Sequence, residues 1–398
     1  MTDVSTVGVL GAGTMGAGIV QVAVEAGLAV LMHYSVEGAT ERARRRIEGF
    51  IGRKVEKGQL PAHAAAAAMA RIQEVGSLEE LAAADLVVEA IPEDLDLKRD
   101  AVGRLAAASG DAILATNTSS LPVTRIASAA DRPGRVAGMH FFNPVPLMAL
   151  VEVIPGSRTE PDVIGAVTRL AGRLGKVPIV ATDTPGFIVN RIQRAYYLEA
   201  FRILEQGQGG IGDIDDAMRG IGFRLGPFEL ADLVGTDVNL AAGTAIFEGF
   251  FGDARYRPAL VQRRVVDAGR LGRKSAAGYY DYGTDGARGG PWSALGTNAR
   301  LPRLSPAQIE ARILASIVNE AASAVADGVA APADIDTAMR LGANWPDGPI
   351  VWGERIGLSS VVHTLDALHA AVPDGRYRVV PLLRALADDG GTFAAARA

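Results

Sequence analysis

The chain has 398 residues, of which 48% are hydrophobic and 21% charged, and its formal net charge is -5. This is a globular composition, and the length suffices for two or three domains, so extensive disorder is not expected. The negative charge argues against a general nucleic-acid binder. The chain contains no cysteine, which excludes disulfides, thiolate metal sites and a cysteine nucleophile.

The first residues and the apolar runs of the chain indicate in which cell compartment the protein is expected. Residues 1–5 lack the basic and apolar regions of a signal peptide. No uncharged apolar run approaches the ~18 residues of a membrane span. His33 and His63 have no neighbour at a ligand-like spacing, so no metal site is expected. We therefore predict a cytoplasmic protein that acts on a small molecule, without nucleic acid or membrane as a partner.

Short apolar runs alternate with helical stretches over the first 184 residues. The expected strands are residues 7–10, 29–32, 85–90, 112–115, 136–139 and 150–153. Nearly continuous apolar strands separated by helices are typical of a mainly parallel sheet that is covered on both faces. The sequence predicts a Rossmann-type, doubly wound α/β domain over residues 1–184.

A glycine-rich turn follows the first expected strand and opens a helix. The run Gly11-Ala12-Gly13-Thr14-Met15-Gly16 has the G-x-G-x-x-G spacing of dinucleotide-binding turns. Gly11 permits the tight turn, Gly13 lets the backbone approach a pyrophosphate, and Gly16 allows close packing of helix on strand. The backbone of Thr14 and Met15 supplies donors at the helix N-terminus. These features predict a nicotinamide dinucleotide site.

The end of the second strand departs from the usual pattern. An acidic residue normally stands there and binds the ribose 2′-hydroxyl. Residues 32–36 contain none; instead Tyr34 and Ser35 could contact the adenine and the ribose or its 2′-phosphate. Arg42 or Arg44 could assist, and the lack of a carboxylate removes repulsion of that phosphate. The sequence therefore predicts NAD or NADP and leaves the preference open.

After residue 184 helical spacing dominates, and a motif occurs twice. Residues 213–230 and 334–351 share D-I-D-x-A-M-R, and each copy follows a helix that contains a Glu-Ala pair. A glycine-rich stretch at 282–290 is expected to be a linker. We predict three domains: 1–184, a helical domain at 185–290, and a second copy of the helical module at 291–398.

Five segments together suggest a family. They are V-E-A-I-P-E-D at 88–94, T-N-T-S-S-L at 116–121, G-M-H-F-F-N-P-V-P at 138–146, L-V-E-V at 150–153, and D-T-P-G-F-I-V-N-R at 183–191. In this order and spacing, from about residue 5 to 282, the chain resembles the L-3-hydroxyacyl-CoA dehydrogenase family, which includes 3-hydroxybutyryl-CoA dehydrogenases.

The chemistry of alcohol oxidation supports the same interpretation. A base must take the hydroxyl proton while hydride leaves to the nicotinamide, and imidazole has a suitable pKa near neutrality. His140 ends a strand beside the expected cofactor site, and Glu152 on the next strand can accept its other ring N–H. The resemblance implies that Ser119 and Asn190 contact the substrate oxygen.

The resemblance also implies contacts for the cofactor and for CoA. Beside the cofactor it places Ala90, Glu93, Lys98, Asn117, Ser119, Asn143 and Lys274. For Glu93 and Lys98 an ordinary solvated helix pair is an alternative. Arg53, Lys54 and Lys57 would complement the phosphates of CoA, although a solvated helix face also explains them. Near Lys274 the family usually has a glycine where this chain has Ala276.

The expected reaction is (S)-3-hydroxyacyl-CoA + NAD(P)+ ⇌ 3-oxoacyl-CoA + NAD(P)H + H+. Substrates the size of acetoacetyl-CoA are expected first and dicarboxylic acyl-CoA next. Two alternatives stay open: a dehydrogenase of a free hydroxy acid such as L-gulonate, and a catalytically idle crystallin-like cofactor-binding protein. The second helical copy predicts a monomer with an internal pseudo-dimer, residues 300–398 serving as a built-in partner, or else a homodimer.

Overall fold

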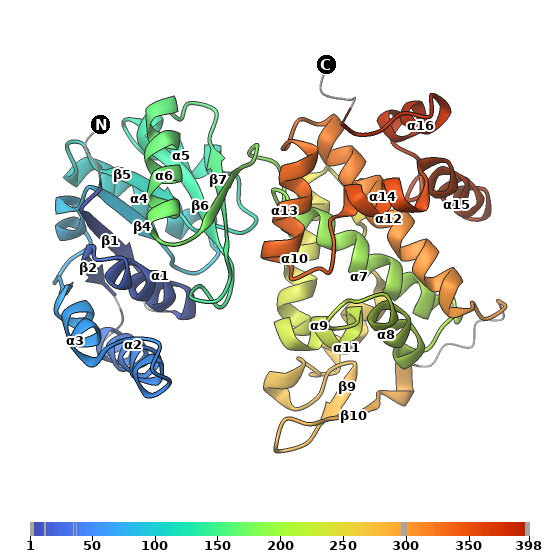
Figure 1. Cartoon of the computed structure of the whole chain (residues 1–398), viewed down its shortest axis with the longest axis horizontal. Helices are drawn as coiled ribbons and strands as arrows, with labels where there is room; N and C mark the ends of the chain where they lie inside the picture. Colours follow the sequence, from blue (N-terminus) through green and yellow to red (C-terminus); the bar gives the residue numbers. More distant parts are fainter. Residues whose placement is uncertain (1–3, 12, 35, 37, 296–300, 395–398) are drawn as a thin grey trace. The chain divides into compact units, whose positions relative to one another are not determined.

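The computed structural model describes residues 4–11, 13–34, 36, 38–295 and 301–394. The chain divides into two compact units, residues 1–187 and 188–398. The first unit is α/β and the second is almost entirely helical (Figure 1). Over the described ranges no single helix is long and apolar enough to span a membrane; one sharply bent pair, α9 (Pro227–Val234) and α10 (Thr236–Gly249), meets the length and composition criteria together.

The first unit is built on an eight-stranded sheet. In spatial order its strands are β3 (Ile72–Glu74), β2 (Ala29–His33), β1 (Thr6–Leu10), β4 (Leu86–Glu89), β5 (Ile113–Thr116), β6 (Val136–Phe141), β7 (Leu150–Pro155) and β8 (Val177–Val180). Neighbouring strands are parallel except β6 and β7, which are antiparallel. The predicted mainly parallel sheet is confirmed. Strands β3 and β8 escaped prediction because they are short and partly exposed edge strands, without a continuous apolar run.

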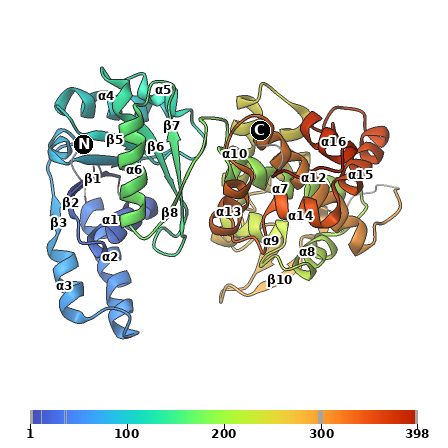
Figure 2. The same cartoon turned by 45° about the horizontal axis from the view of Figure 1, so that its top comes forward.

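Helices cover both faces of this sheet (Figure 2). One buried cluster joins the sheet to α1 (Thr14–Glu25), α2 (Ala39–Glu56) and α6 (Pro161–Arg173). The other joins it to α4 (Leu95–Ala108), α5 (Val123–Ala127) and the short helix η1 (Glu79–Ala83). Helix α3 (Ala62–Ala70) packs beside α2, and the two run as a helical hairpin in both views. A second short helix, η2 (Pro133–Arg135), precedes β6.

The second unit consists of two successive helical sets. The first comprises α7 (Val189–Glu205), α8 (Ile211–Gly220), α9, α10, η3 (Ala254–Tyr256), α11 (Leu260–Asp267) and η4 (Arg273–Ser275). The second comprises α12 (Pro306–Ala326), α13 (Pro332–Gly342), α14 (Pro349–Ile356), α15 (Leu358–Ala371) and α16 (Pro381–Asp388). Both sets lie within one compact unit, in which α7 and α12 pack against each other.

The two ends of the stretch expected to be a linker lie in strands. Strands β9 (Tyr280–Tyr282) and β10 (Arg288–Pro291) form an antiparallel pair, followed by η5 (Ser293–Leu295). Gly283 and Gly286 lie in the connection between the strands, where Gly286 has φ +78°, whereas Gly289 and Gly290 lie in β10. Arg288 then anchors β10 to α9 through an ion pair of 2.6 Å with Glu229.

Two matched ion pairs join the repeated sets. Arg191 on α7 donates from Nε to Glu320 Oε1 on α12 at 2.6 Å, and Arg312 on α12 donates from Nε to Glu199 Oε1 on α7 at 2.9 Å. All four side chains are buried. The sequence offset that relates the two D-I-D-x-A-M-R copies also relates Arg191 to Arg312 and Glu199 to Glu320. The two sets therefore meet as an isologous, self-complementary interface within one chain.

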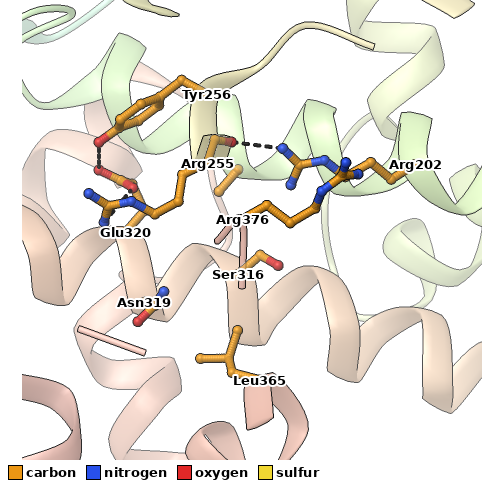
Figure 3. Close-up of a pocket in the computed structure, with 9 residues that line it drawn as sticks. Arg202, Arg255, Tyr256, Ser316, Asn319, Glu320, Leu365 and Arg376 are labelled. Atoms are coloured by element: carbon orange, nitrogen blue, oxygen red, sulfur yellow. Dashed lines mark hydrogen bonds and ion pairs between the residues drawn. The ribbon is translucent and has the colours of Figure 1, made fainter. Parts of the chain in front are cut away.

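Tyrosines complete the same pattern. The hydroxyl of Tyr256 donates to Glu320 Oε1 at 2.6 Å, as Figure 3 shows, and the hydroxyl of Tyr377 donates to Glu199 Oε1 at 3.2 Å. The repeated motif has a local role as well. Its second aspartate accepts backbone N–H groups at the start of the next helix, Asp215 from Phe228 of α9 and Asp336 from Ile350 of α14.

Candidate active site

The glycine turn lies at the carboxyl ends of β1 and β4, where the strand order of the sheet reverses. Gly11 has φ +123°, and a Cβ there would lie 2.4 Å from the carbonyl oxygen of Ala90. A Cβ on Gly16 would lie 2.0 Å from the carbonyl oxygen of Gly11. A Cβ on Gly13 would meet no protein atom within 4 Å. The turn is therefore tight at its two ends and open above its centre.

Helix α1 begins directly after this opening. Its N-cap, Gly13, supplies no side-chain cap, and its first turn contains no acidic residue. Unsatisfied N–H groups at a helix N-terminus bind anions, so the turn fits the pyrophosphate of a dinucleotide.

At the end of β2 stands Tyr34, which is 8% exposed and whose hydroxyl has no hydrogen-bond partner among the described residues. Burial raises the pKa of this hydroxyl above its usual value, although Arg46 acts to lower it. Arg46 on α2 also reaches the hydroxyl of Thr14 at 3.4 Å. Sequence reasoning missed Arg46, which follows Arg42 by one helical turn. Arg44 pairs with Glu48 of its own helix at 3.4 Å, and Ser35 lies outside the described residues.

His140 and Glu152 are direct partners across the antiparallel strands β6 and β7. The distance from His140 Nδ1 to Glu152 Oε2 is 2.6 Å, and the two residues are 5% and 0% exposed. Because a carboxylate only accepts hydrogen bonds, Nδ1 donates and Nε2 is left as the basic ring nitrogen. Phe142 and Phe187 flank the imidazole, with ring centroids at 4.5 and 5.9 Å. The contact expected between the two residues is present.

A buried ion pair lies at the end of β4. Lys98 is 1% exposed and donates from Nζ to Glu89 Oε1 at 2.7 Å and to the carbonyl of Ile91 at 3.2 Å. The other carboxylate oxygen of Glu89 accepts from the Thr116 hydroxyl at 2.6 Å. The alternative of a solvated helix pair is therefore wrong for Lys98. Sequence reasoning missed Glu89; the available signal was a carboxylate that ends an otherwise apolar strand.

Glu93 organises the loop after β5. Its Oε1 accepts from the Thr118 hydroxyl at 2.8 Å and from the backbone N–H groups of Ser119 and Ser120, each at 2.9 Å. Burial acts to raise the pKa of Glu93, but Lys98 and these hydrogen bonds outweigh it and hold that pKa below the usual value. The loop is thus held at the carboxyl edge of the sheet with Ser119 in its centre.

The two asparagines predicted to lie beside the cofactor in this unit, Asn117 and Asn143, have different surroundings. Asn117 Oδ1 accepts the backbone N–H of Phe141 at 2.8 Å, which ties the loop after β5 to β6. Asn143 is exposed and lines a pocket of about 380 Å³ together with Thr14.

This pocket also contains the three cations assigned to CoA. Its lining includes Arg53, Lys54 and Lys57 of the α2 segment, beside apolar groups such as Phe50 and Leu147. The guanidinium of Arg53 lies over the Phe50 ring, 4.6 Å from its centroid. Lys54 is paired with Glu25 at 2.6 Å, which reduces the charge that it can offer to a ligand.

The two remaining predicted residues belong to the second unit. Asn190 lies in the first turn of α7. Lys274 is paired with Asp237, its Nζ lying 2.6 and 2.7 Å from the two carboxylate oxygens. Ala276 has φ +56°, a left-handed conformation that favours glycine. In the described part of the chain no cluster of three or more His, Asp or Glu side chains could hold a metal ion.

Comparison with known families covers nearly the whole chain. The family described as "3-hydroxyacyl-CoA dehydrogenase, NAD binding domain" matches residues 6–184. The family described as "3-hydroxyacyl-CoA dehydrogenase, C-terminal domain" matches residues 186–282 and 309–395. The two segments of the second match correspond to the two helical sets.

Individual relatives carry related names. The 3-hydroxyadipyl-CoA dehydrogenase of Escherichia coli (strain K12) is 35% identical over 96% of this chain and 98% of its own length. A probable 3-hydroxybutyryl-CoA dehydrogenase of Deinococcus radiodurans is 42% identical over 69% of this chain and 99% of its own. The crystal structure of a 3-hydroxybutyryl-CoA dehydrogenase from Escherichia coli K12 matches with a TM-score of 0.89 and 35% identity, over 97% of this chain and 98% of that one.

Proposed function

The chain belongs to the 3-hydroxyacyl-CoA dehydrogenase family, and on that premise we propose that it interconverts (S)-3-hydroxyacyl-CoA and 3-oxoacyl-CoA with His140 as the proton-transfer group. It is a nicotinamide-dependent oxidoreductase. The observation that carries the proposed mechanism is the 2.6 Å bond between His140 and Glu152 at the carboxyl edge of the sheet that bears the glycine turn.

His140 acts as general base during oxidation and as general acid during reduction. Nε2 takes the proton of the 3-hydroxyl group, and a bound nicotinamide supplies the acceptor for the hydride that leaves the same carbon. Glu152 is a positioning residue, since it fixes which ring nitrogen carries hydrogen and stabilises the imidazolium that forms. A positioned acid or base of this kind contributes roughly 10²–10⁴ in rate.

The substrate oxygen needs donors besides the imidazole. We assign this role to the hydroxyl of Ser119, whose loop is held in place by Glu93, and to the side-chain amide of Asn190. Donors placed where negative charge develops stabilise the transition state more than the ground state. The pocket lined by Arg53, Lys54 and Lys57 would hold the phosphates of CoA, with Phe50 and Leu147 as its apolar wall.

For the cofactor we propose that NADP is accepted as well as NAD. Tyr34 stands where a ribose-binding carboxylate is usual, and Arg46 lies within reach of Thr14 at the start of α1. Measuring kcat/KM with NADH and NADPH tests this, and Tyr34→Asp should shift the ratio toward NADH by tenfold or more. A wild-type preference for NADH above a hundredfold would contradict the proposal.

The helical copy at 309–395 is proposed to act as a built-in partner for the first copy. The matched pairs Arg191–Glu320 and Arg312–Glu199 support this, because they make the interface self-complementary within one chain. Light scattering of the full chain should then give the mass of a single chain. A stable dimer would refute this proposal and favour the homodimer.

The reaction itself is tested with acetoacetyl-CoA and a nicotinamide cofactor. His140→Ala should lower kcat by about 10²–10⁴, and Glu152→Gln should lower it while shifting its pH profile. Cofactor affinity should change by less than threefold in both variants. His63→Ala, in the exposed start of α3, is the matched control.

The alternatives predict other outcomes in the same assay. Turnover of free acetoacetate or L-gulonate without turnover of the thioester would identify a dehydrogenase of free hydroxy acids. Cofactor binding without turnover of any of these compounds would identify a catalytically idle binding protein. Relatives are named for both adipyl and butyryl substrates. Acetoacetyl-CoA is therefore the default substrate, with a dicarboxylic acyl-CoA as the next choice.

A further inference from the structure

A buried glutamate at the end of β4 holds the start of the loop after β5. Glu89 is 1% exposed, and its register partner in β5 is Thr116. Its Oε2 accepts the Thr116 hydroxyl at 2.6 Å, and its backbone carbonyl accepts the N–H of Asn117 at 2.8 Å. The loop at 117–121, which contains Ser119, therefore starts from two residues that are bound to Glu89.

The other carboxylate oxygen of Glu89 faces a cation. Oε1 accepts from Lys98 Nζ at 2.7 Å and from the backbone N–H of Ile91 at 2.8 Å. Lys98 Nζ also lies 3.5 Å from Glu93 Oε2, so the ammonium stands between two carboxylates, of which Glu89 is the nearer. Because the Lys98 side chain is 1% exposed, bulk water and salt screen these charges little.

Glu93 uses its two carboxylate oxygens for different partners. Oε2 lies toward Lys98, whereas Oε1 accepts from the Thr118 hydroxyl at 2.8 Å and from the backbone N–H groups of Ser119 and Ser120 at 2.9 Å. The hydroxyls of these two serines donate to the same oxygen, at 3.2 and 3.0 Å. A displacement of Glu93 toward Lys98 would therefore lengthen every one of these bonds to the loop.

The same loop is tied to the strand that carries His140. Asn117 Oδ1 accepts the backbone N–H of Phe141, the residue after His140, at 2.8 Å. All of these groups belong to the first unit, so the position of Ser119 relative to His140 is set within that unit. In the proposed reaction both side chains act on one substrate oxygen, and a misplacement of about 1 Å can cost roughly 10² in rate.

We propose that Glu89 is a positioning residue for Ser119 and that it acts through the charge of Lys98. The ionised Glu89 balances the ammonium from the buried side and leaves Glu93 to the loop. Without that charge, Lys98 would keep only Glu93 as a carboxylate partner among the described residues, and their attraction would draw Glu93 away from the loop. This inference rests on the proposed function, in which Ser119 binds the substrate oxygen.

The kinetic test removes the charge of Glu89 and keeps its shape. In Glu89→Gln the carbonyl oxygen can still accept from Lys98 and Ile91, and the Thr116 hydroxyl can accept from the new amide. With acetoacetyl-CoA and saturating cofactor, kcat should fall at least tenfold while KM changes by less than threefold, since the loop and not the CoA pocket is displaced.

A second substitution separates positioning from mere stabilisation. Adding Lys98→Met removes the cation that attracts Glu93, so the double variant should regain a kcat within threefold of wild type. Glu79→Gln is the matched control, because it removes the 2.7 Å partner of Arg104, another cation of α4, at an exposed position. This control should keep the wild-type kcat.

Hydrogen exchange tests the same contacts without turnover. The amides of Ser119 and Ser120 are bound to Glu93, so mass spectrometry of residues 117–121 reports whether the loop is held. Exchange should be at least tenfold faster in Glu89→Gln and should return to the wild-type rate in the double variant. That pattern supports the inference even if no thioester is reduced, in which case only the proposed reaction is refuted. Unchanged exchange in Glu89→Gln, or a double variant that turns over as slowly as the single one, would overturn the inference.

Discussion

Replacing Glu320 by alanine breaks one of the two matched ion pairs that join the helical copies. Arg191 is fully buried; it would lose the 2.6 Å bond from its Nε to Glu320 and keep the 2.6 Å pair of its Nη2 with Asp327, which is about half exposed. Burial acts to lower the pKa of Arg191, whereas Glu320, Tyr256 and Asp327 raise it above the usual value, and Glu320 contributes most to stabilising this buried cation. Tyr256 would also lose the acceptor of its hydroxyl.

The expected loss follows from this burial. Removing one partner of a buried ion pair costs about 3–5 kcal/mol when the remaining charge is left uncompensated. Because Asp327 still pairs with Arg191 in this variant, we expect a loss of about 3 kcal/mol, the lower end of that range. With a urea m-value of about 2 kcal/mol/M, the unfolding midpoint should fall by about 1.5 M. An apolar double variant, Arg191→Met with Glu320→Leu, removes both charges and should lose less than the single variant.

Tryptophan fluorescence provides a selective assay. All three tryptophans, Trp292, Trp345 and Trp352, lie in the second unit, so urea unfolding followed by their emission reports on that unit. Asp366→Ala is the matched control, since Asp366 pairs with Arg384 at 2.6 Å but both are about half exposed, and an exposed pair contributes ~1 kcal/mol or less. If Glu320→Ala costs no more than Asp366→Ala, the reasoning about the buried interface is refuted.

Three further variants test local features. Ala276→Gly should stabilise the second unit by about 1 kcal/mol in urea unfolding, because it relieves a left-handed alanine; a loss of stability would contradict this. Gly13→Ala should leave the unfolding midpoint measured by circular dichroism unchanged, because the added Cβ meets no protein atom within 4 Å. It should raise the Kd for NADH at least tenfold in a fluorescence titration, because that Cβ occupies the space through which the pyrophosphate approaches the turn. Glu93→Gln should destabilise the first unit at pH 7. The pKa of Glu93 in the folded protein lies below the unfolded value of about 4.3, so its carboxylate stabilises the fold above that pH. The difference in unfolding free energy between wild type and variant should therefore narrow as the pH falls below that value. A difference that stays constant down to pH 3, measured by urea unfolding, would exclude that role.

Much of the first unit was predictable because its signals are local. The apolar runs predicted six of the eight strands. The G-x-G-x-x-G spacing located the turn in which a Cβ on Gly11 or Gly16 would collide with the backbone of Ala90 or Gly11, respectively. The contact between His140 and Glu152 was also expected, since consecutive strands commonly pair. Strands β3 and β8 and the β9–β10 hairpin were not, because three or four residues carry too little periodicity.

The amino-acid sequence alone determined the class of fold, the dinucleotide turn, the His140–Glu152 pair and the presence of a repeated helical motif. Only the tertiary structure decided that Glu89 neutralises a buried Lys98, and that Arg191 and Arg312 each pair with a glutamate of the other helical copy. Backbone conformation and apolar periodicity depend on residues a few positions apart, so the order of residue types along the chain is enough to predict helices, strands and tight turns. Ion pairs and cavities depend on which distant side chains packing brings together, and no spacing along the chain encodes that.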